Sequence, residues 1–296
     1  MSDLFGFLLI DKEQGWTSHD VVAKVRRHAG GKVGHAGTLD PMATGLLVLG
    51  MGKATRLLRF VQGARKQYLA TAQFGVATDS LDADGAVLSR DPMPVDEEST
   101  RAAMERFEGD ILQVPPMVSA RKVEGKRLYE LAREGKVVER EARPVTIDSL
   151  ELVDFAPSDY PEVTFRVECS TGTYVRTLAD DIARALGGRA HLSALRRIAN
   201  GSLSVHDAHS VEEATTAFDE SRGSEMLVPA VDALPPMASV RVDEATEMRV
   251  RNGRPIDALN DDVLDDDLVC VLSRGGDLIA MYRRTAGSLK PEVVLA

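Results

Sequence analysis

The most informative stretch of the chain is residues 34–45, which read GHAGTLDPMATG. Three glycines and one proline constrain the backbone of a loop, because glycine reaches conformations closed to other residues and proline restricts φ. The loop presents one carboxylate, Asp40, and one imidazole, His35. An aspartate before a proline is also common in ordinary turns, so the loop alone does not establish a reactive site.

Short strands and helices are predicted on both sides of this loop, with no internal repeat. Apolar alternation or short apolar runs predict strands over 5–10, 46–49, 68–74, 145–155 and 163–169. Helical spacing of apolar residues predicts helices over 18–28, 53–61, 97–107 and 173–186, the first capped by Ser18. The 82–85 stretch reads as a hairpin turn, and a basic segment runs on through Arg197. The predicted fold class is mixed α+β.

Prolines predict a boundary between two domains. Pro229 and the pair Pro235-Pro236 divide the 296-residue chain into 1–234 and 235–296. This length is about twice that of a typical domain. After the boundary, short predicted strands at 268–272, 278–282 and 293–295 with little helix indicate a small β-rich module.

The composition is that of an ordinary globular protein, with 44% hydrophobic and 28% charged residues. No apolar run approaches the roughly 18 residues that a membrane span requires, and Met1-Ser2-Asp3 lacks the basic start of a secretory signal. The two cysteines, Cys169 and Cys270, form no CxxC pair and suit a reducing compartment. We therefore expect a cytoplasmic protein without a membrane segment.

The net charge of −10 hides local basic clusters. Residues 1–70 hold ten Lys and Arg against five Asp and Glu, whereas residues 71–110 hold three against ten. The clusters are Lys24-Arg26-Arg27-Lys32, Lys53-Arg56-Arg59, Arg65-Lys66, Arg121-Lys122-Lys126-Arg127 and Arg189-Arg196-Arg197. Any one of them could be a solvated helix face, but binding to a polyanion depends on such clusters and not on the total. An RNA or DNA partner is therefore compatible with the composition.

Several common sites are excluded by residue type. The 45–55 stretch lacks the first glycine and the Ser or Thr of a phosphate-binding P-loop. Positions 80–91 resemble a calcium loop but lack its final glutamate and its flanking helices. The six histidines form no HExxH motif and have no cysteine partner nearby. We expect no metal and no nucleotide cofactor.

Three further segments carry residues that packing does not require. Tyr68 stands at the start of a predicted strand, where it could equally belong to the core. Arg176 lies in the first turn of a predicted helix, where a cation opposes the helix dipole and an anionic partner is expected. The third segment is Leu195-Arg196-Arg197.

Together these segments resemble the bacterial tRNA pseudouridine-55 synthase family, over most of the chain from Leu9 to about Arg197. The 34–45 loop matches the family's nucleophile motif GHxGxLDPxAxG. Residues 12–18 resemble its KPxGxTS segment, with Glu13 in place of the usual proline. Residues 78–85 resemble its TDTxDxxG hairpin, and residues 115–133 resemble an insertion that clamps the tRNA arm.

The resemblance implies roles for individual residues. It implies that Asp40 acts on the ribose or base, that Arg176 keeps this carboxylate charged, and that Tyr68 stacks on a flipped base and serves as acid or base. The residues expected to contact the substrate are His35, as a wedge in the RNA, Tyr174 and Leu195, as pocket walls, and Lys12, Arg121, Lys122, Arg196 and Arg197. Pseudouridine formation is redox-neutral, so the family needs neither a metal nor a nucleotide cofactor.

The resemblance also implies the architecture and the partner. We expect a pseudouridine synthase core with a curved mixed or antiparallel sheet, an RNA-clamping insertion over 117–143, and a C-terminal PUA-like domain. The expected substrate is the T-arm of tRNA, bound by a monomer. Because 257–267 holds six acids and no base, this run cannot itself contact phosphate.

Two other functions remain open at this point. A tRNA-binding or folding chaperone on the same scaffold would use every basic cluster equally well. Binding alone does not call for a carboxylate such as Asp40 in an RNA-facing loop, where it would repel phosphate. A glycosidase acting on small sugars needs two acidic residues across the bond, and these motifs supply only one.

Overall fold

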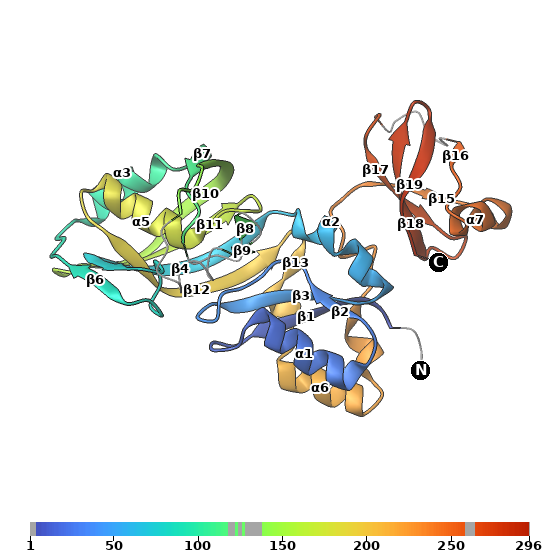
Figure 1. Ribbon diagram of the computed structural model, residues 1–296, viewed down its shortest axis with the longest axis horizontal. Helices are drawn as coiled ribbons and strands as arrows, with labels where there is room; N and C mark the ends of the chain where they lie inside the picture. Colours follow the sequence, from blue (N-terminus) through green and yellow to red (C-terminus); the bar gives the residue numbers. More distant parts are fainter. Residues whose placement is uncertain (1–3, 118–121, 124–125, 128–137, 258–263, 296) are drawn as a thin grey trace.

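The computed structural model describes residues 4–117, 122–123, 126–127, 138–257 and 264–295, and it contains two separate large sheets (Figure 1). The larger sheet has ten strands in the order β14-β1-β3-β12-β4-β11-β10-β7, with β13 paired to β12 and β2 paired to β3. These strands are β1 (Phe5–Lys12), β2 (Val33–His35), β3 (Thr44–Gly52), β4 (Lys66–Phe74), β7 (Gly109–Gln113), β10 (Arg143–Ala156), β11 (Glu162–Cys169), β12 (Ala190–Asn200), β13 (Leu203–Ser204) and β14 (Leu227–Val228). The β3–β12 pair is parallel and the other pairs are antiparallel, so the sheet is mixed, as predicted.

Helices cover the two ends of this sheet (Figure 1). α1 (Ser18–Ala29) and α6 (Val211–Asp219) lie together beside β1 and β3, whereas α3 (Glu97–Glu105) and α5 (Val175–Ala185) lie over the β4, β10 and β11 end. A 3₁₀ turn (Lys53–Leu57) leads into α2 (Leu58–Gln62). Two hairpins complete this part, β5 (Val76–Thr78) with β6 (Val87–Arg90) and β8 (Lys122–Val123) with β9 (Lys126–Arg127). In the described residues, none of the helices is both long and apolar enough to span a membrane.

The smaller sheet is built from residues near the C-terminus. Its order is β15-β17-β18-β19-β16, with α7 (Glu244–Arg251) beside it. The strands are β15 (Ala238–Arg241), β16 (Ile256–Asp257), β17 (Leu268–Leu272), β18 (Leu278–Thr285) and β19 (Ser288–Val294). The division into 1–234 and 235–296 remains a proposal, since side chains of both sheets share one apolar cluster. That cluster includes Phe7 and Leu9 from β1 and Met281 from β18.

Several elements were not predicted from the sequence, among them β12, α6 and short strands such as β2, β7 and β14, and one cap was misplaced. The basic segment before Arg197 is the central strand β12, whose bulges between Leu192 and Ala194 and between Arg197 and Ala199 interrupt the alternation that marks a strand. α6 was not predicted, and the smaller sheet carries α7 where little helix was expected. The cap of α1 is Thr17 and not Ser18, since Thr17 and Asp20 form a reciprocal capping box.

Ser18 instead ties α1 to the 34–45 loop. Its buried hydroxyl accepts a hydrogen bond from the Leu39 amide at 2.8 Å and donates to the Leu39 carbonyl at 3.1 Å. The loop is therefore held one residue before Asp40 by a rigid helix.

Candidate active site

A cavity of about 240 Å³ opens beside the larger sheet, where β4, β12, the loop after β2 and the start of α5 meet. The loop after β2 contributes Asp40, β4 contributes Tyr68, and the start of α5 contributes Arg176. Its complete lining is Gly37, Thr38, Leu39, Asp40, Gln62, Lys66, Tyr68, Thr171, Gly172, Thr173, Tyr174, Val175, Arg176, Leu195 and Arg197. Residues from distant parts of the sequence thus converge on one pocket, as the resemblance implies.

Asp40 and Arg176 form an ion pair in this cavity, with 3.1 Å between Arg176 Nε and Asp40 Oδ2. The Arg176 side chain is 4% exposed, whereas 36% of the Asp40 side chain is accessible. The guanidinium is therefore fixed by the protein, while the carboxylate can be reached from the cavity.

Burial raises the pKa of Asp40 above its ordinary value, and the positive charge of Arg176 opposes that rise. Asp82 raises this pKa further and Lys12 lowers it. The result is a poorly solvated carboxylate beside a fixed cation, which is the environment of a reactive group.

Asp82 is a site residue that the sequence analysis did not identify. Its Oδ2 accepts a hydrogen bond from Arg176 Nη1 at 2.9 Å, and the Ser80 carbonyl accepts from the same nitrogen at 2.9 Å. Asp82 Oδ1 accepts from the Asp84 amide at 3.2 Å. The β5–β6 hairpin thus carries a second acid, but at 4% exposure and with these bonds Asp82 is a partner of Arg176 and not a free acid. This geometry disfavours the glycosidase alternative.

Tyr68 is 8% exposed and lines the cavity from β4. Burial raises the pKa of Tyr68, while the charge of Arg197 and a hydrogen bond with its guanidinium lower it. The hydroxyl therefore stays protonated at neutral pH and is oriented by Arg197. The sequence left open whether Tyr68 belongs to the core or to the site, and it contributes to both.

Arg197 and Arg196 belong to one basic cluster in the sequence, but Arg197 is buried and Arg196 is paired with an acid. Arg197 is 1% exposed, and it donates from Nε to the Leu46 carbonyl at 2.6 Å and from Nη2 to the Gly37 carbonyl at 3.1 Å. It supports the cavity wall and cannot reach an external phosphate. Arg196 is bound to both carboxylate oxygens of Asp11, at 2.9 and 2.7 Å. Arg197 is therefore not an exposed phosphate contact. The Arg196 side chain is 38% exposed, and its expected contact with the substrate stays a prediction.

Lys12 is likewise a buried residue and not an open RNA contact. Its ammonium donates to the carbonyls of Trp16 at 2.8 Å, Glu13 at 3.0 Å and Pro41 at 3.4 Å. Burial lowers the pKa of Lys12 to about 8, although Asp40 opposes this effect. Lys12 therefore links the end of β1 to the backbone beside Asp40.

Only some of the other residues expected to contact the substrate line the cavity. Tyr174 and Leu195 line the cavity, and the Tyr174 backbone is held by two hydrogen bonds with the Gln113 side chain, at 2.7 and 3.1 Å. His35 is not part of the lining; its ring lies edge-on to that of His19, with 5.5 Å between the centroids. The Arg121 and Lys122 side chains, and most of the 117–143 segment, lie outside the described residues.

Comparisons with known proteins identify the family. The model of the TruB family pseudouridylate synthase N-terminal domain matches residues 24–175, and that of the tRNA pseudouridylate synthase B C-terminal domain matches residues 176–235. A tRNA pseudouridine synthase B from Burkholderia mallei (strain NCTC 10247) is 43% identical over 294 residues, 98% of this chain and 96% of that protein. The one from Arthrobacter sp. (strain FB24) is 42% identical over 303 residues, 99% of this chain and 97% of that protein.

Solved structures are similar over almost the whole chain. One in a Cbf5-Nop10-Gar1 complex has a TM-score of 0.77 at 25% identity and covers 99% of this chain and 85% of its own. Another, in an H/ACA RNP bound to a substrate RNA containing 2'-deoxyuridine, has a TM-score of 0.77 at 23% identity. It covers 99% of this chain and 86% of its own, and at this identity it supports the fold alone. The chain belongs to the TruB family of pseudouridylate synthases and is an isomerase.

Proposed function

We propose that this isomerase converts uridine 55 in the T-arm of tRNA to pseudouridine, with Asp40 as the reacting carboxylate. The observation that carries the proposal is the 3.1 Å ion pair between accessible Asp40 and buried Arg176 in the cavity wall. The reaction breaks the C1′–N1 bond, turns the uracil and joins C5 to C1′. Attack on C1′, attack on C6 and assistance to a glycal route all begin from the same ionised carboxylate.

Arg176 favours that ionised form. Its charge lowers the pKa of Asp40 against the effect of burial, and Asp82 holds the guanidinium in place. A preorganised ion pair needs little rearrangement when charge develops during the reaction.

The aromatic and apolar lining suits a base that has left the RNA stack. Tyr68 offers a ring for stacking and a hydroxyl for proton transfer, while Tyr174 and Leu195 supply apolar contact. His35 lies on β2, just before the loop that carries Asp40, and we assign it the wedge in the space that the nucleotide vacates.

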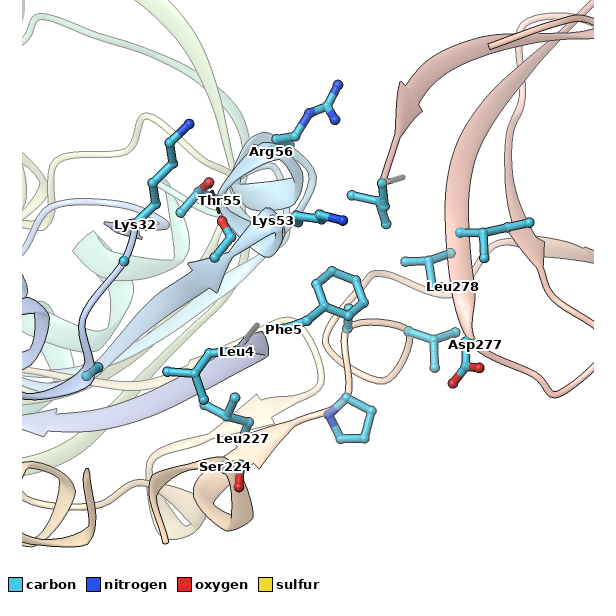
Figure 2. A pocket seen from close by; sticks show the side chains of 18 of the residues that line it. Leu4, Phe5, Lys32, Lys53, Thr55, Arg56, Ser224, Leu227, Asp277 and Leu278 are labelled. Carbon is cyan, nitrogen blue, oxygen red and sulfur yellow. Dashed lines mark hydrogen bonds between the residues drawn. The ribbon is translucent and has the colours of Figure 1, made fainter. Parts of the chain in front are cut away.

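The T-arm needs a basic surface beyond this cavity. A second cleft, of about 1150 Å³, has Lys32, Lys53 and Arg56 on one side and Leu278 and Asp277 on the other (Figure 2). The side chains of Lys32 and Lys53 are exposed and form no hydrogen bond or ion pair with any part of the chain that the structure describes. They are free to neutralise phosphates, as we also expect of Arg121 and Lys122 in the 117–143 clamp.

One chain suffices for this function. Asp40, Tyr68 and Arg176 all come from a single chain, which fits a monomer. The cytoplasm is the expected compartment, since both cysteines are free and buried.

The test is to incubate the purified protein with an unmodified tRNA transcript and to map pseudouridine along it. Modification at position 55, and its loss when uridine 55 is replaced by cytidine, supports the proposal. Tight binding without any pseudouridine would favour the chaperone alternative, and pseudouridine elsewhere would contradict the assignment of the target.

A further inference from the structure

Two buried cations line the reaction cavity without an acidic partner. Lys66 is 6% exposed and Arg197 is 1% exposed, and both belong to the cavity lining. In the described ranges, each donates only to uncharged oxygens: Lys66 to the carbonyls of Gln62 and Ala64, and Arg197 to backbone carbonyls and Tyr68. Buried charges are costly unless they are paired, so these two need an explanation.

The acids of the site do not compensate them. Asp40 and Asp82 share the guanidinium of Arg176, and buried Lys12 adds another positive charge near Asp40. The cations of the site, Lys12, Lys66, Arg176 and Arg197, thus outnumber its acids, Asp40, Asp82 and Asp84. The surplus of positive charge fits a cavity whose ligand becomes an anion during the reaction.

A purely structural role accounts for only part of the Lys66 geometry. Its ammonium, at 2.6 Å from the Gln62 carbonyl and 2.7 Å from the Ala64 carbonyl, stabilises the end of α2. An ammonium group has three N–H donors, so one remains for a ligand in the cavity that Lys66 lines. Burial also lowers the pKa of Lys66 to about 8, with a further contribution from Arg197, and an anionic ligand would favour the charged form.

We propose that Lys66, together with Arg197, holds the detached uracil as its anion while the glycosidic bond is open. The inference rests on the proposed function and applies when the base is released from C1′. The C1′–N1 electron pair then stays on uracil. Either C1′ bonds to an Asp40 oxygen, or C2′ gives its proton to Asp40 and a C1′–C2′ double bond forms. On rejoining, a C5 electron pair bonds C1′ as the bond between C1′ and Asp40 breaks or as C2′ takes its proton back. C5–H is then released as a proton, and N1 gains one. The sequence is redox-neutral, and the base is an anion only between the two steps.

The experiment compares an anionic with a neutral base in the complete site. The full chain is saturated with a T-arm hairpin that has an abasic nucleotide at position 55. Binding of 5-nitrouracil, an anion at pH 7.5, and of thymine, neutral and of similar width, is then measured by calorimetry. We expect 5-nitrouracil to bind at least tenfold more tightly. Equal binding, or no detectable binding of 5-nitrouracil, overturns the inference without any need for a variant.

Variants assign the preference to Lys66. In Lys66→Met the preference for 5-nitrouracil should fall at least fivefold, whereas Lys66→Arg should keep most of it. Lys290→Met, which removes an exposed lysine from β19, is the matched control and should match the wild type. Thermal unfolding of each variant shows whether it is folded. A folded Lys66→Met with the wild-type preference contradicts the role of Lys66.

Turnover of intact tRNA by the wild type is measured in parallel. No pseudouridine at position 55 would defeat the proposed function. Normal turnover without an anion preference would defeat only this further inference.

Discussion

Arg176 Nε lies 3.1 Å from Asp40 Oδ2, and the same guanidinium is held from behind by Asp82 at 2.9 Å. The three residues come from a loop, a helix and a hairpin that are separated by up to 136 positions in the sequence. A half-buried carboxylate that can be reached from the cavity is thereby oriented by a cation that the protein itself keeps in place.

Asp82→Asn should reduce turnover with little change in the affinity for tRNA. The amide cannot match the charged hydrogen bond to Arg176, whose loss is worth about 1.5–3 kcal/mol, or roughly ten- to a hundredfold in rate. Single-turnover release of tritium from C5-labelled uridine in tRNA measures this. Asp91→Asn, an exposed position after the same hairpin, is the control. A wild-type rate for Asp82→Asn would show that Arg176 needs no second carboxylate.

Turnover should fall as the pH is lowered, and the midpoint of this acid limb of the pH–rate profile should lie above the ordinary pKa of an aspartate, 3.8. Burial raises the pKa of Asp40, so the reactive charged form is lost at a higher pH as the solution is acidified. Arg176→Ala removes the main influence that lowers this pKa and should move the limb to still higher pH. Single-turnover rates from pH 4 to 8 test both points. A limb that stays fixed in Arg176→Ala would assign the titration to another group.

Tyr68→Phe should retain tRNA affinity and lose turnover. The ring remains available for stacking, and only the hydroxyl beside Arg197 is removed. Binding is measured by filter retention and turnover by tritium release. Unchanged turnover would leave Tyr68 as a stacking surface and assign the proton transfer to another group.

Affinity for tRNA should fall steeply with salt despite the net charge of −10. If about four to six phosphates are neutralised, the slope of log K against log salt is about −3 to −5. Lys53→Glu, in the basic side of the second cleft, should make the slope shallower. Lys290→Glu, which makes the same charge change on β19, should leave the slope unaltered. Equal slopes for both variants would place the phosphate contacts elsewhere.

Local sequence predicted the parts of the site that depend on neighbouring residues. The 34–45 loop, the strand that carries Tyr68 and the helix that begins near Arg176 follow from glycine and proline positions and from apolar spacing. The sequence predicts an anionic partner for Arg176, and the structure gives it two, Asp40 and Asp82. Asp82 was missed as that partner because its turn is 94 residues away in sequence from Arg176.

The burial of individual charged side chains could not be predicted from the sequence. Arg197 and Lys12 look like surface cations in a linear chain, but both are buried beside the Asp40 loop. In β12 the charged residues and two bulges hide the alternation, so neither the strand nor its central position could be predicted. Such features depend on which distant segments pack together.

The most direct test of the account is the single-turnover rate of Asp40→Asn on tRNA, measured with its dissociation constant for the same tRNA. Asparagine keeps the shape of the side chain and removes the charge that pairs with Arg176. We predict no detectable pseudouridine at position 55 with affinity within about threefold of the wild type. A rate within tenfold of the wild type, equivalent to about 1.4 kcal/mol of barrier, would contradict the assignment of Asp40 as the reacting carboxylate.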